Sequence, residues 1–522
     1  MKINKIMSVE AALDLIRDDD TIAISSASMV GYPDYIVKCL EDRYLETKHP
    51  GALTLYAGCG HGNPVGYGAD DRFGHPGFLK RTVCTHPQVV PKLGKFIDSG
   101  EIEAYGFPQG VVNQLYRCSA AKQPGLLTKI GIGTYCDPRQ DGGKLNSATT
   151  EDLVEVMVID GEEYLFYKSK PIDVAIIRGT TADERGNITI EHESLKLEIL
   201  EIALAAKSSG GKVIVQVKRT AAAGTLNAKD VVVPGEVVDA VVVCDDVKEY
   251  HRQTAGTVYN PYMSGELTCP DGAVSVPKEV LEANDIVCRR AAYEIYRGAV
   301  INVGVGIGVG VGSVADVEGI IKDVTFTLEL GVFGGTPQAM PDFGAAINAT
   351  SYLSHPSMFD YYHSGGLDIA FLGAAQIDAE GNVNVSRFGG RAAGQGGFID
   401  ISQTAKKVVF CTYFNAKGFE ASVKDGKLNI ESEGKFPKFV DKVDQITFCG
   451  KRSREKGQEV VICTERCVFT LVKDGVMITE IAPGVDLEKD ILANMGFKPI
   501  ISENLKVMDE KVFIPGRMGC FD

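Results

Sequence analysis

The chain lacks the excess of basic residues on which nucleic-acid binding depends. Its 522 residues include 54 Lys and Arg against 69 Asp and Glu, which gives a formal net charge of -15 at pH 7. Proteins bind nucleic-acid phosphates through Lys and Arg side chains that displace counterions, so this balance argues against nucleic acid as a partner. Any anionic ligand must therefore be bound by a local site.

Membrane and secretion signals are also missing. The longest uncharged run, residues 299–315, has 17 residues, which is short for a membrane span. Its alternation of Gly and Val favours a strand and a loop over a helix. Residues 1–20 carry too many acidic side chains for a signal peptide and instead predict an amphipathic helix. We predict no membrane segment and a cytoplasmic protein.

Cysteine and histidine patterns typical of metal sites are absent. The 13 cysteines are odd in number, and the closest pair, Cys463 and Cys467, has the spacing of neither a zinc knuckle nor a redox pair. The 8 histidines include no H-E-x-x-H motif, and Cys59 and His61 have no second pair of ligands nearby. We expect reduced thiols and no metal ion.

Two further signatures are missing. The chain has no G-x-S-x-G nucleophile motif. Residues 304–312 read GVGIGVGVG, but Val309 stands where a dinucleotide-binding motif requires its third Gly. Gly304 and Gly306 end a predicted strand before a helix, so they could still approach a phosphate or a pantetheine chain. A packing role for these glycines is an equal alternative.

The sequence does contain an internal repeat. Residues 173–190 align without gaps to residues 368–385 at an offset of 195, and both copies place an Asp-x-x-Gly-Asn turn between two apolar strands. The same offset relates a second apolar segment further along the chain. A looser match between the segments that begin at Ala12 and Ala292 has an offset of about 279. A duplicated domain is the simplest cause.

The repeat predicts the architecture. Helical patterns such as residues 195–210 alternate with apolar strands such as residues 237–244, which indicates an α/β fold with mainly parallel sheets. We predict two tandem, similar α/β domains, 1–275 and 276–522. Because the offset falls along the chain, the first domain should hold roughly 80 extra residues within about 40–160, as loops or a cap. Ligands of such sheets bind beyond the carboxyl ends of the strands.

One carboxylate is placed unusually. Glu329 ends an apolar, β-branched run in TLELGVFGGTPQ, residues 327–338, and Gly331, Gly334 and Gly335 follow it closely. A carboxylate that touches a large ligand needs backbone without side chains beside it. Most glutamates at strand ends, however, are simply solvated. The residues alone leave both interpretations open.

A second glycine cluster offers backbone amides. Residues 394–398 read GQGGF, and consecutive amides without bulky side chains can form an oxyanion hole. With YGFPQG at residues 105–110, these segments make the chain similar to the class I coenzyme A transferases, most closely to the propionate and acetate CoA-transferase branch. The resemblance runs over essentially the whole chain, and the order of the motifs is its most specific feature. Further motifs that carry it are GFLKR, TTEDLVEV, EEYLFY, FDYYHSGGLDIAFLGAAQ and GNVNVSRFGG.

The resemblance implies roles for particular residues. Glu329 matches the glutamate that becomes covalently attached during turnover, and Gln109 matches a glutamine that reaches the same pocket, although it could also cap a turn. Gly396 and Gly397 match the segment used near the thioester carbonyl. The positions expected at the CoA itself are Gly304, Gly306, Gly334, Gly335, Gly394 and Arg387. Arginines of this kind are often solvated or structural, which is the alternative for Arg387.

The activity implied by the resemblance is CoA transfer between a short-chain acyl-CoA and a free carboxylate of the acetate or propionate type. It would follow a ping-pong mechanism through a glutamyl-CoA thioester, with CoA thioesters as substrates and no cofactor. An acyl-CoA hydrolase that uses the same glutamate and a non-catalytic paralogue are the alternatives. Family members are commonly homo-oligomers, so a homodimer or homotetramer is expected. Leu330 and residues 27–33 and 338–344 depart from the branch pattern, and we expect a short-chain monocarboxylate.

Overall fold

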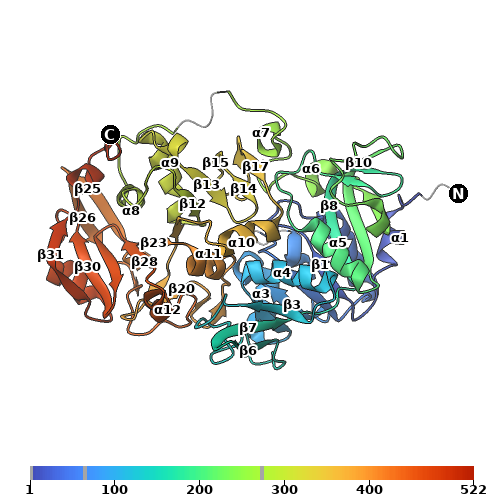
Figure 1. The fold of residues 1–522 in the computed structure, drawn as a ribbon, viewed down its shortest axis with the longest axis horizontal. Coiled ribbons are helices and arrows are strands. Elements are labelled where there is room, and N and C mark those ends of the chain that lie inside the picture. Colours follow the sequence, from blue (N-terminus) through green and yellow to red (C-terminus); the bar gives the residue numbers. More distant parts are fainter. Residues whose placement is uncertain (1–3, 63–67, 271–274) are drawn as a thin grey trace. The chain divides into compact units, whose positions relative to one another are not determined.

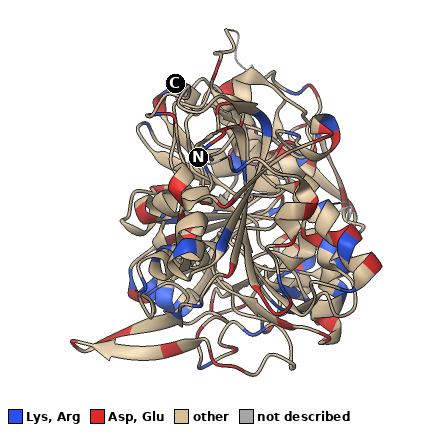
Figure 2. Cartoon of the chain, turned by 90° about the vertical axis from the view of Figure 1, so that its right-hand side faces the viewer, with Lys and Arg blue, Asp and Glu red and all other residues tan. Residues whose placement is uncertain are grey.

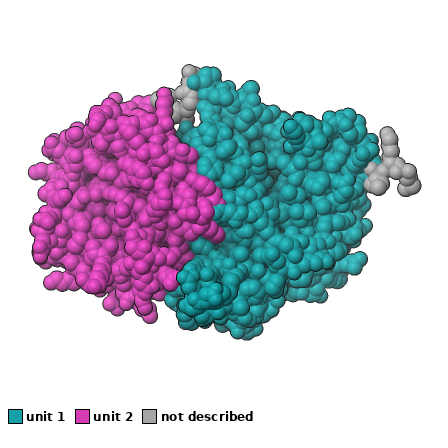
Figure 3. Space-filling model, viewed as in Figure 1, with its two compact units in different colours: residues 1–270, 329–360, 390–400 teal, residues 271–328, 361–389, 401–522 magenta. Residues whose placement is uncertain are grey.

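The computed structural model describes residues 4–62, 68–270 and 275–522. Two compact units divide it (Figure 3): unit 1 holds residues 1–270, 329–360 and 390–400, and unit 2 holds residues 271–328, 361–389 and 401–522. Two segments of the predicted second domain thus pack with unit 1, and Glu329 begins the first of them. Residues 271–274, next to the predicted boundary at 275, lie outside the described residues.

Unit 1 is built on a parallel sheet of apolar strands (Figure 1). Its strand order is β11-β10-β8-β1-β2-β3-β4, and all ten residues of β8 are buried, as expected for a strand covered on both faces. The sheet strands are β1 (Thr21–Ile24), β2 (Leu53–Ala57), β3 (Leu79–Cys84), β4 (Glu103–Gly106), β8 (Val174–Asp183), β9 (Ile188–Thr189), β10 (Lys212–Ala221) and β11 (Ala240–Val243). The helices before residue 270 are α1 (Val9–Leu13), α2 (Asp34–Thr47), α3 (Pro91–Ser99), α4 (Gln109–Ala120), α5 (Ile199–Ser208), α6 (Val247–Tyr250) and α7 (Pro261–Ser264).

Part of the predicted extra material forms a small antiparallel sheet. Its order is β5-β7-β6, and its strands are β5 (Gly125–Thr128), β6 (Val154–Ile159) and β7 (Glu162–Lys168). The other segments of unit 1 supply two short antiparallel pairs, β14 (Val332–Phe333) with β17 (Ser351–Tyr352) and β15 (Thr336–Pro337) with β16 (Ala346–Ile347). These pairs form the backbone that follows Glu329.

Unit 2 repeats the parallel arrangement and extends it. The order within it is β13-β12-β18-β23-β28-β29-β30-β31, parallel from β13 to β28 and antiparallel at β29 and β30. The strands are β12 (Val300–Val303), β13 (Thr325–Leu328), β18 (Ile369–Leu372), β23 (Lys407–Cys411), β28 (Glu459–Cys463), β29 (Cys467–Val472), β30 (Gly475–Ile481) and β31 (Ile500–Val507). The later helices are α8 (Ala283–Ala292), α9 (Gly310–Val317), α10 (His355–His363), α11 (Phe398–Thr404) and α12 (Gly450–Glu455), of which α10 and α11 begin in unit 1. Short strands complete the list: β19 (Gln376–Ile377), β20 (Val383–Asn384), β21 (Arg387–Phe388), β22 (Arg391–Ala392), β24 (Asn415–Ala416), β25 (Glu420–Lys424), β26 (Lys427–Ser432) and β27 (Phe436–Pro437).

The structure confirms the predicted fold class and the duplication. The parallel order β10-β8-β1-β2 of unit 1 recurs as β23-β18-β12-β13 in unit 2. Asp173 and Asp368 each accept a hydrogen bond from the first strand of their sheet, from the N–H of Thr21 (2.8 Å) and of Val300 (2.9 Å). The two Asp-x-x-Gly-Asn turns also match, because Asp183 and Asp378 each accept the N–H of the Asn four residues later.

The registers extend this equivalence to the strand that precedes Glu329. In unit 1 Ile22 pairs with Val174 and Leu55, and in unit 2 Ile301 pairs with Ile369 and Phe326. Ile22 and Ile301 differ by the offset of 279 found in the sequence. Leu55 is therefore equivalent to Phe326. Three residues further on, Gly58 is equivalent to Glu329.

Two local expectations are modified. The amphipathic helix expected over residues 1–20 is confined to Val9–Leu13, because the chain turns after Asp14 and enters β1 at Thr21. In the run 299–315, the strand Val300–Val303 is followed by a helix that begins at Gly310. The last glycines of the run, Gly310 and Gly312, are therefore helical. Among the described residues no helix is both long enough and apolar enough to span a membrane. In the view of Figure 2, Lys and Arg are interspersed with Asp and Glu.

Candidate active site

Glu329 lies directly beyond the carboxyl end of a buried parallel strand. β13 ends at Leu328, which is 0% exposed, and Glu329 follows in the next position as a partly exposed side chain. This is the edge at which α/β sheets bind ligands. The position predicted from the apolar run is therefore the one that the structure shows.

The three glycines after Glu329 have a local explanation. Gly331, Gly334 and Gly335 all adopt positive φ, at 107°, 69° and 72°. A β-carbon at Gly334 would lie 2.7 Å from Oγ1 of Thr350, and one at Gly331 would clash with the carbonyl oxygen of Leu353. Close backbone packing thus requires these glycines. The predicted role of Gly334 and Gly335 in CoA binding stays a prediction.

Cys59 and Glu198 share the surroundings of Glu329. Burial raises the pKa of the Cys59 thiol above its usual range, and the charges of Glu329 and Glu198 add to this effect. Cys59 lies on the loop after β2, and Glu198 is the residue before α5. These two segments thus lie within electrostatic range of each other. Sequence reasoning considered Cys59 only as a metal ligand and did not single out Glu198.

Gln109 begins α4 and is 2% exposed. Its Nε2 lies 2.7 Å from Nε2 of His355, the first residue of α10, and Nδ1 of His355 lies 2.8 Å from Oε2 of Glu198. His355 and Glu198 are both 0% exposed. The starts of three helices therefore bring together one buried chain of polar side chains, of which the sequence had indicated Gln109 alone.

The GQGGF segment lies against Gln109. The N–H of Gln109 donates to the carbonyl oxygen of Gly396 (3.2 Å), and the N–H of Gly396 donates to the carbonyl oxygen of Thr85 (2.9 Å). The amide of Gly396 is thus already engaged. The N–H of Gly397 has no hydrogen-bond partner among the described residues. Of the two predicted oxyanion donors, Gly397 is the one whose amide is free to bind a ligand.

The position that a β-carbon on Gly396 would occupy is bordered by polar atoms, and we call this position the recess. A β-carbon built on it would lie 3.4 Å from Nδ1 of His86 and 3.5 Å from Oε1 of Gln109. Burial lowers the pKa of His86 to about 4, so this imidazole is neutral at physiological pH. Gly394 is packed more tightly, because its β-carbon would lie 2.5 Å from the carbonyl oxygen of Thr85.

Hydrogen bonds to neighbouring side chains hold the two motifs YGFPQG and GQGGF together. Tyr135 donates its hydroxyl to Oε1 of Gln395, whose Nε2 donates to the carbonyl oxygen of Phe107. Asp400 accepts the N–H of Gly110, next to Gln109, at 3.0 Å. Sequence reasoning missed Tyr135 and Asp400, since neither belongs to a recognisable pattern.

The remaining predicted CoA positions belong to unit 2. Gly304 and Gly306 follow β12, and Gly306 has a φ of 113° with no atom within 4 Å of an added β-carbon. Arg387 is half-buried. The role of these three residues in CoA binding stays a prediction.

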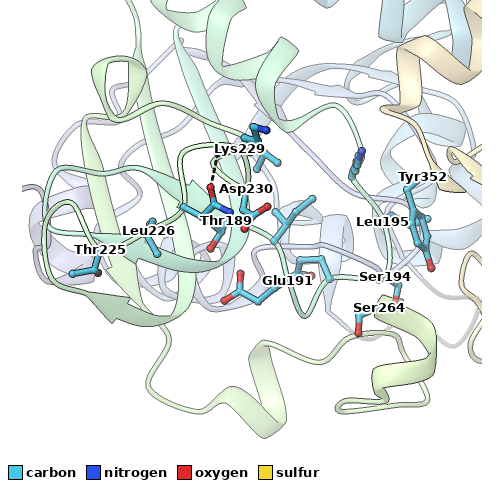
Figure 4. Close-up of a pocket in the computed structure, with 15 residues that line it drawn as sticks. Thr189, Glu191, Ser194, Leu195, Thr225, Leu226, Lys229, Asp230, Ser264 and Tyr352 are labelled. Atoms are coloured by element: carbon cyan, nitrogen blue, oxygen red, sulfur yellow. Dashed lines mark hydrogen bonds between the residues drawn. The ribbon is translucent and has the colours of Figure 1, made fainter. Parts of the chain in front are cut away.

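A separate pocket of about 530 Å³ opens elsewhere in unit 1. Figure 4 shows Ser194, Leu195 and Tyr352 on one side of it and Thr225 and Leu226 on the other. None of the predicted site residues lines this pocket. The pocket is therefore distinct from Glu329 and from the polar groups around Gln109.

Comparison with known proteins agrees with this geometry. A family model for coenzyme A transferase matches residues 6–244. The chain is 45% identical to the caffeate CoA-transferase of Acetobacterium woodii, over 98% of this chain and 97% of that protein. It is 42% identical to the acetate CoA-transferase YdiF of Escherichia coli (strain K12), over 98% and 96% of the two chains. The chain belongs to the class I CoA-transferase family.

Solved structures agree on the fold of this CoA-transferase. The crystal structure of the acyl-CoA transferase YdiF apoenzyme from Escherichia coli O157:H7 has a TM-score of 0.94 and 41% identity, covering 99% of this chain and 98% of that one. A thioester complex of the same protein with CoA has a TM-score of 0.93 and 40% identity, over 99% and 98% of the two chains. The predicted recognition, fold class and enzyme class are thereby confirmed.

Among the described residues, no group of three or more His, Cys, Asp or Glu side chains is arranged to hold a metal ion. The 13 cysteines are all free thiols in the structure.

Proposed function

We propose that this CoA-transferase moves CoA between a short-chain acyl-CoA and a free monocarboxylate, with Glu329 as the nucleophile. The observation that carries the proposal is the position of Glu329, at the end of a buried parallel strand and within electrostatic range of Cys59. A lone carboxylate is a weak nucleophile, so its use fits a reaction that exchanges carboxyl derivatives. The thioester complex with CoA of the 40% identical relative supports the same chemistry.

The reaction would proceed in two half-reactions. A carboxylate oxygen of Glu329 attacks the acyl-CoA carbonyl, the carbon–sulfur bond breaks, and an acyl-glutamyl anhydride and CoA thiolate result. The thiolate then attacks the glutamyl carbonyl, which releases the acyl group as its carboxylate and leaves Glu329 as a CoA thioester. A second carboxylate reverses both steps and leaves as its CoA ester. Atoms and charge balance without ATP, so we propose no cofactor.

Two groups could stabilise the negative oxygen that develops on the attacked carbonyl. The N–H of Gly397 has no partner among the described residues, and Gln109 borders the recess at Gly396. Removing one such donor commonly costs a hundredfold or more in rate. Gly396 contributes the space for the carbonyl and not its amide, which Thr85 already holds.

The surroundings of Glu329 also suit intermediates that water would destroy. Leu328, Leu330 and Val332 are 0%, 2% and 1% exposed. An anhydride or thioester at Glu329 survives only if water is kept away from it. This burial favours transfer over hydrolysis as the outcome.

Mass spectrometry tests the central claim. Incubation with acyl-CoA and no acceptor should add the mass of CoA less one water, with the adduct mapped to the peptide that contains Glu329. Glu329→Gln preserves the volume and should lose both the adduct and transfer. An adduct on a cysteine instead, or normal transfer by the variant, would contradict the mechanism. Release of free CoA in the presence of an acceptor acid, without a new CoA ester, would assign the protein as a hydrolase.

The acid is the least constrained part of the proposal. The two similar relatives are named for acetate and for caffeate, which differ greatly in size. We propose a short-chain monocarboxylate, to be tested with a panel of acetate, propionate, butyrate, lactate and caffeate. A strict preference for a dicarboxylate or for the aromatic acid would contradict it. We also propose a homodimer or homotetramer, which light scattering in solution would test.

A further inference from the structure

In the buried chain Glu198–His355–Gln109, a carboxylate is paired with a histidine and with no Lys or Arg among the described residues. Oε2 of Glu198 contacts Nδ1 of His355 at 2.8 Å, and Oε1 of Glu198 has no hydrogen-bond partner among the described residues. Nε2 of His355 contacts Nε2 of Gln109 at 2.7 Å. All three side chains are at most 2% exposed. The carboxylate therefore shares its environment with one titratable partner, and that partner touches Gln109.

Hydrogen-bond chemistry couples the two ends of this chain. The carboxamide of Gln109 donates through Nε2 and accepts through Oε1. When Nε2 faces His355, as in the structure, the imidazole must accept at its own Nε2 and carry its proton on Nδ1 toward Glu198. An additional proton taken up by His355, which makes it an imidazolium paired with Glu198, lies on its Nε2. Only Oε1 of Gln109 can accept that proton, so the carboxamide must turn over.

The other end of the carboxamide faces the proposed reaction. Oε1 of Gln109 lies 3.5 Å from the position of a β-carbon on Gly396, inside the recess that His86 also borders. Turning the carboxamide over would present its N–H groups to the same recess. An oxyanion requires a donor there, whereas an oxygen would repel it.

We infer that Glu198 and His355 are positioning residues for Gln109, and that the proton they hold decides whether Gln109 presents its oxygen or its N–H groups to the reacting carbonyl. This inference rests on the proposed function, since it takes the carbonyl to lie beside Gln109. With the additional proton the site binds an oxyanion. Without that proton, adduct formation is slower.

Other ionisable groups from neighbouring elements are packed around the pair. From the loop after β2, Cys59 has its thiol pKa raised by burial, and from α4, Tyr116 has its pKa raised well above the usual value by burial, so both stay neutral. Glu329, the proposed nucleophile, lies within electrostatic range of the same Cys59. From α11, Asp400 is fixed on the N–H of Gly110.

From α5, Glu201 also faces this region. It accepts from Ser354, the residue before His355, at 3.1 Å, and it pairs with Arg117 at 3.4 Å. Its charge thus has a cationic partner, whereas the described residues give Glu198 only His355. The Glu198–His355 pair is therefore the group expected to take up the proton.

Glu198→Gln is the decisive variant, because it keeps the volume but removes the charge that stabilises a protonated His355. The rate of Glu329 adduct formation in a single turnover would be measured from pH 5.5 to 9. We expect the wild-type rate to fall as the pH rises, because His355 then loses the proton that turns the N–H groups of Gln109 toward the recess. The variant should be at least tenfold slower at low pH and should show no such fall, with half-saturating acyl-CoA changed by less than threefold.

A double-mutant cycle separates positioning from general damage. In the Gln109→Ala background, Glu198→Gln should cost less than a further threefold, because the residue that it positions is gone. His355→Gln should give the same slow, pH-independent rate and serves as a second variant. Additive losses, or a wild-type pH profile in both variants, would overturn the inference while leaving the proposed function intact.

The chain offers a second buried Glu–His pair as a control, in which the glutamate, Glu193, also pairs with Arg178 at 2.5 Å. Glu193 pairs with His251 at 3.2 Å, and these side chains are 8% and 1% exposed. Glu193→Gln should leave the pH profile of adduct formation unchanged and should be additive with Gln109→Ala. A profile altered equally by this control would show a general effect of buried charge and would overturn the inference. Absence of any Glu329 adduct in the wild type would overturn the proposed function and this inference together.

Discussion

Gly396→Ala should separate activity from folding more cleanly than any other change at the site. The φ of Gly396 is 52°, in the left-handed region that an alanine can occupy at a cost of about 1 kcal/mol. The added β-carbon would lie 3.4 Å from Nδ1 of His86 and 3.5 Å from Oε1 of Gln109, both tolerable contact distances. The alanine therefore fits the folded protein but fills the recess proposed for the reacting carbonyl.

The expected loss of activity is large in comparison. A methyl group in the recess would displace the carbonyl by at least about 1 Å from Gln109 and from the N–H of Gly397. A displacement of that size costs on the order of a hundredfold in rate, which corresponds to about 2.7 kcal/mol of transition-state stabilisation. Adduct formation should therefore slow about a hundredfold while stability changes by about 1 kcal/mol.

Gly389→Ala controls for the backbone cost. Gly389 has a φ of 54°, close to that of Gly396, and a β-carbon added there has no atom within 4 Å. Both variants should lose similar stability, but the Gly389 variant should retain wild-type adduct formation. Gly394→Ala marks the opposite case, since its β-carbon would lie 2.5 Å from the carbonyl oxygen of Thr85 and should displace the whole GQGGF segment.

The assay combines urea unfolding with the rate at which intact-protein mass spectrometry detects the CoA adduct. If the Gly396 variant formed the adduct within twofold of the wild-type rate, no reacting group would occupy the recess. If both alanine variants slowed the adduct equally, backbone strain would explain the loss and the positional argument would fail.

Three further predictions follow from charges and distances at the site. Glu329→Asp withdraws the carboxylate by about 1 Å and should slow adduct formation on the order of a hundredfold; an unchanged rate would contradict a nucleophilic role. Burial lowers the pKa of His86 from 6.5 to about 4, so the unfolded chain binds a proton that the folded chain resists. The free energy of unfolding should therefore fall as the pH drops from 6.5 toward 4, and urea titrations at pH 7 and 5 should show a smaller fall for His86→Asn. Burial and the charge of Glu329 raise the pKa of the Cys59 thiol, so Glu329→Gln should speed alkylation of Cys59 by iodoacetamide several-fold at pH 8.5, read by peptide mass spectrometry; an equal rate would argue against their proximity.

Much of the fold could be predicted from the sequence, because the duplication repeats the pattern of apolar strands that forms a parallel sheet. Asp173 and Asp368 are identical residues at equivalent positions of the repeat. Each accepts a hydrogen bond from the backbone of the first strand of its own sheet. What the repeat could not show is the assignment of segments to the compact units. Residues 329–360 and 390–400 follow strands of the second copy but pack with the first, and such packing depends on side-chain contacts that no periodicity records.

The site could be predicted only where its residues form a local pattern in the sequence. Glu329 was visible because a carboxylate at the end of an apolar strand is unusual. The glycines of GQGGF were visible as a group, but which amide is engaged depends on Thr85, more than 300 residues away in sequence. Glu198 and His355 carry no signal of this kind, because each is an ordinary polar residue at a helix start until the fold buries both beside Gln109.

The duplication also shows which residue of the first copy occupies the position of Glu329. The strand registers make Gly58 equivalent to Glu329. A β-carbon at Gly58 would lie 3.1 Å from the ring of Tyr116 and 3.4 Å from the side chain of Asn113, both on α4, so α4 packs closely against this position. The same helix begins at Gln109, the residue that reaches the recess at Gly396. At the strand end where the second copy has a carboxylate, the first copy therefore has a glycine packed against α4, the helix that begins at Gln109.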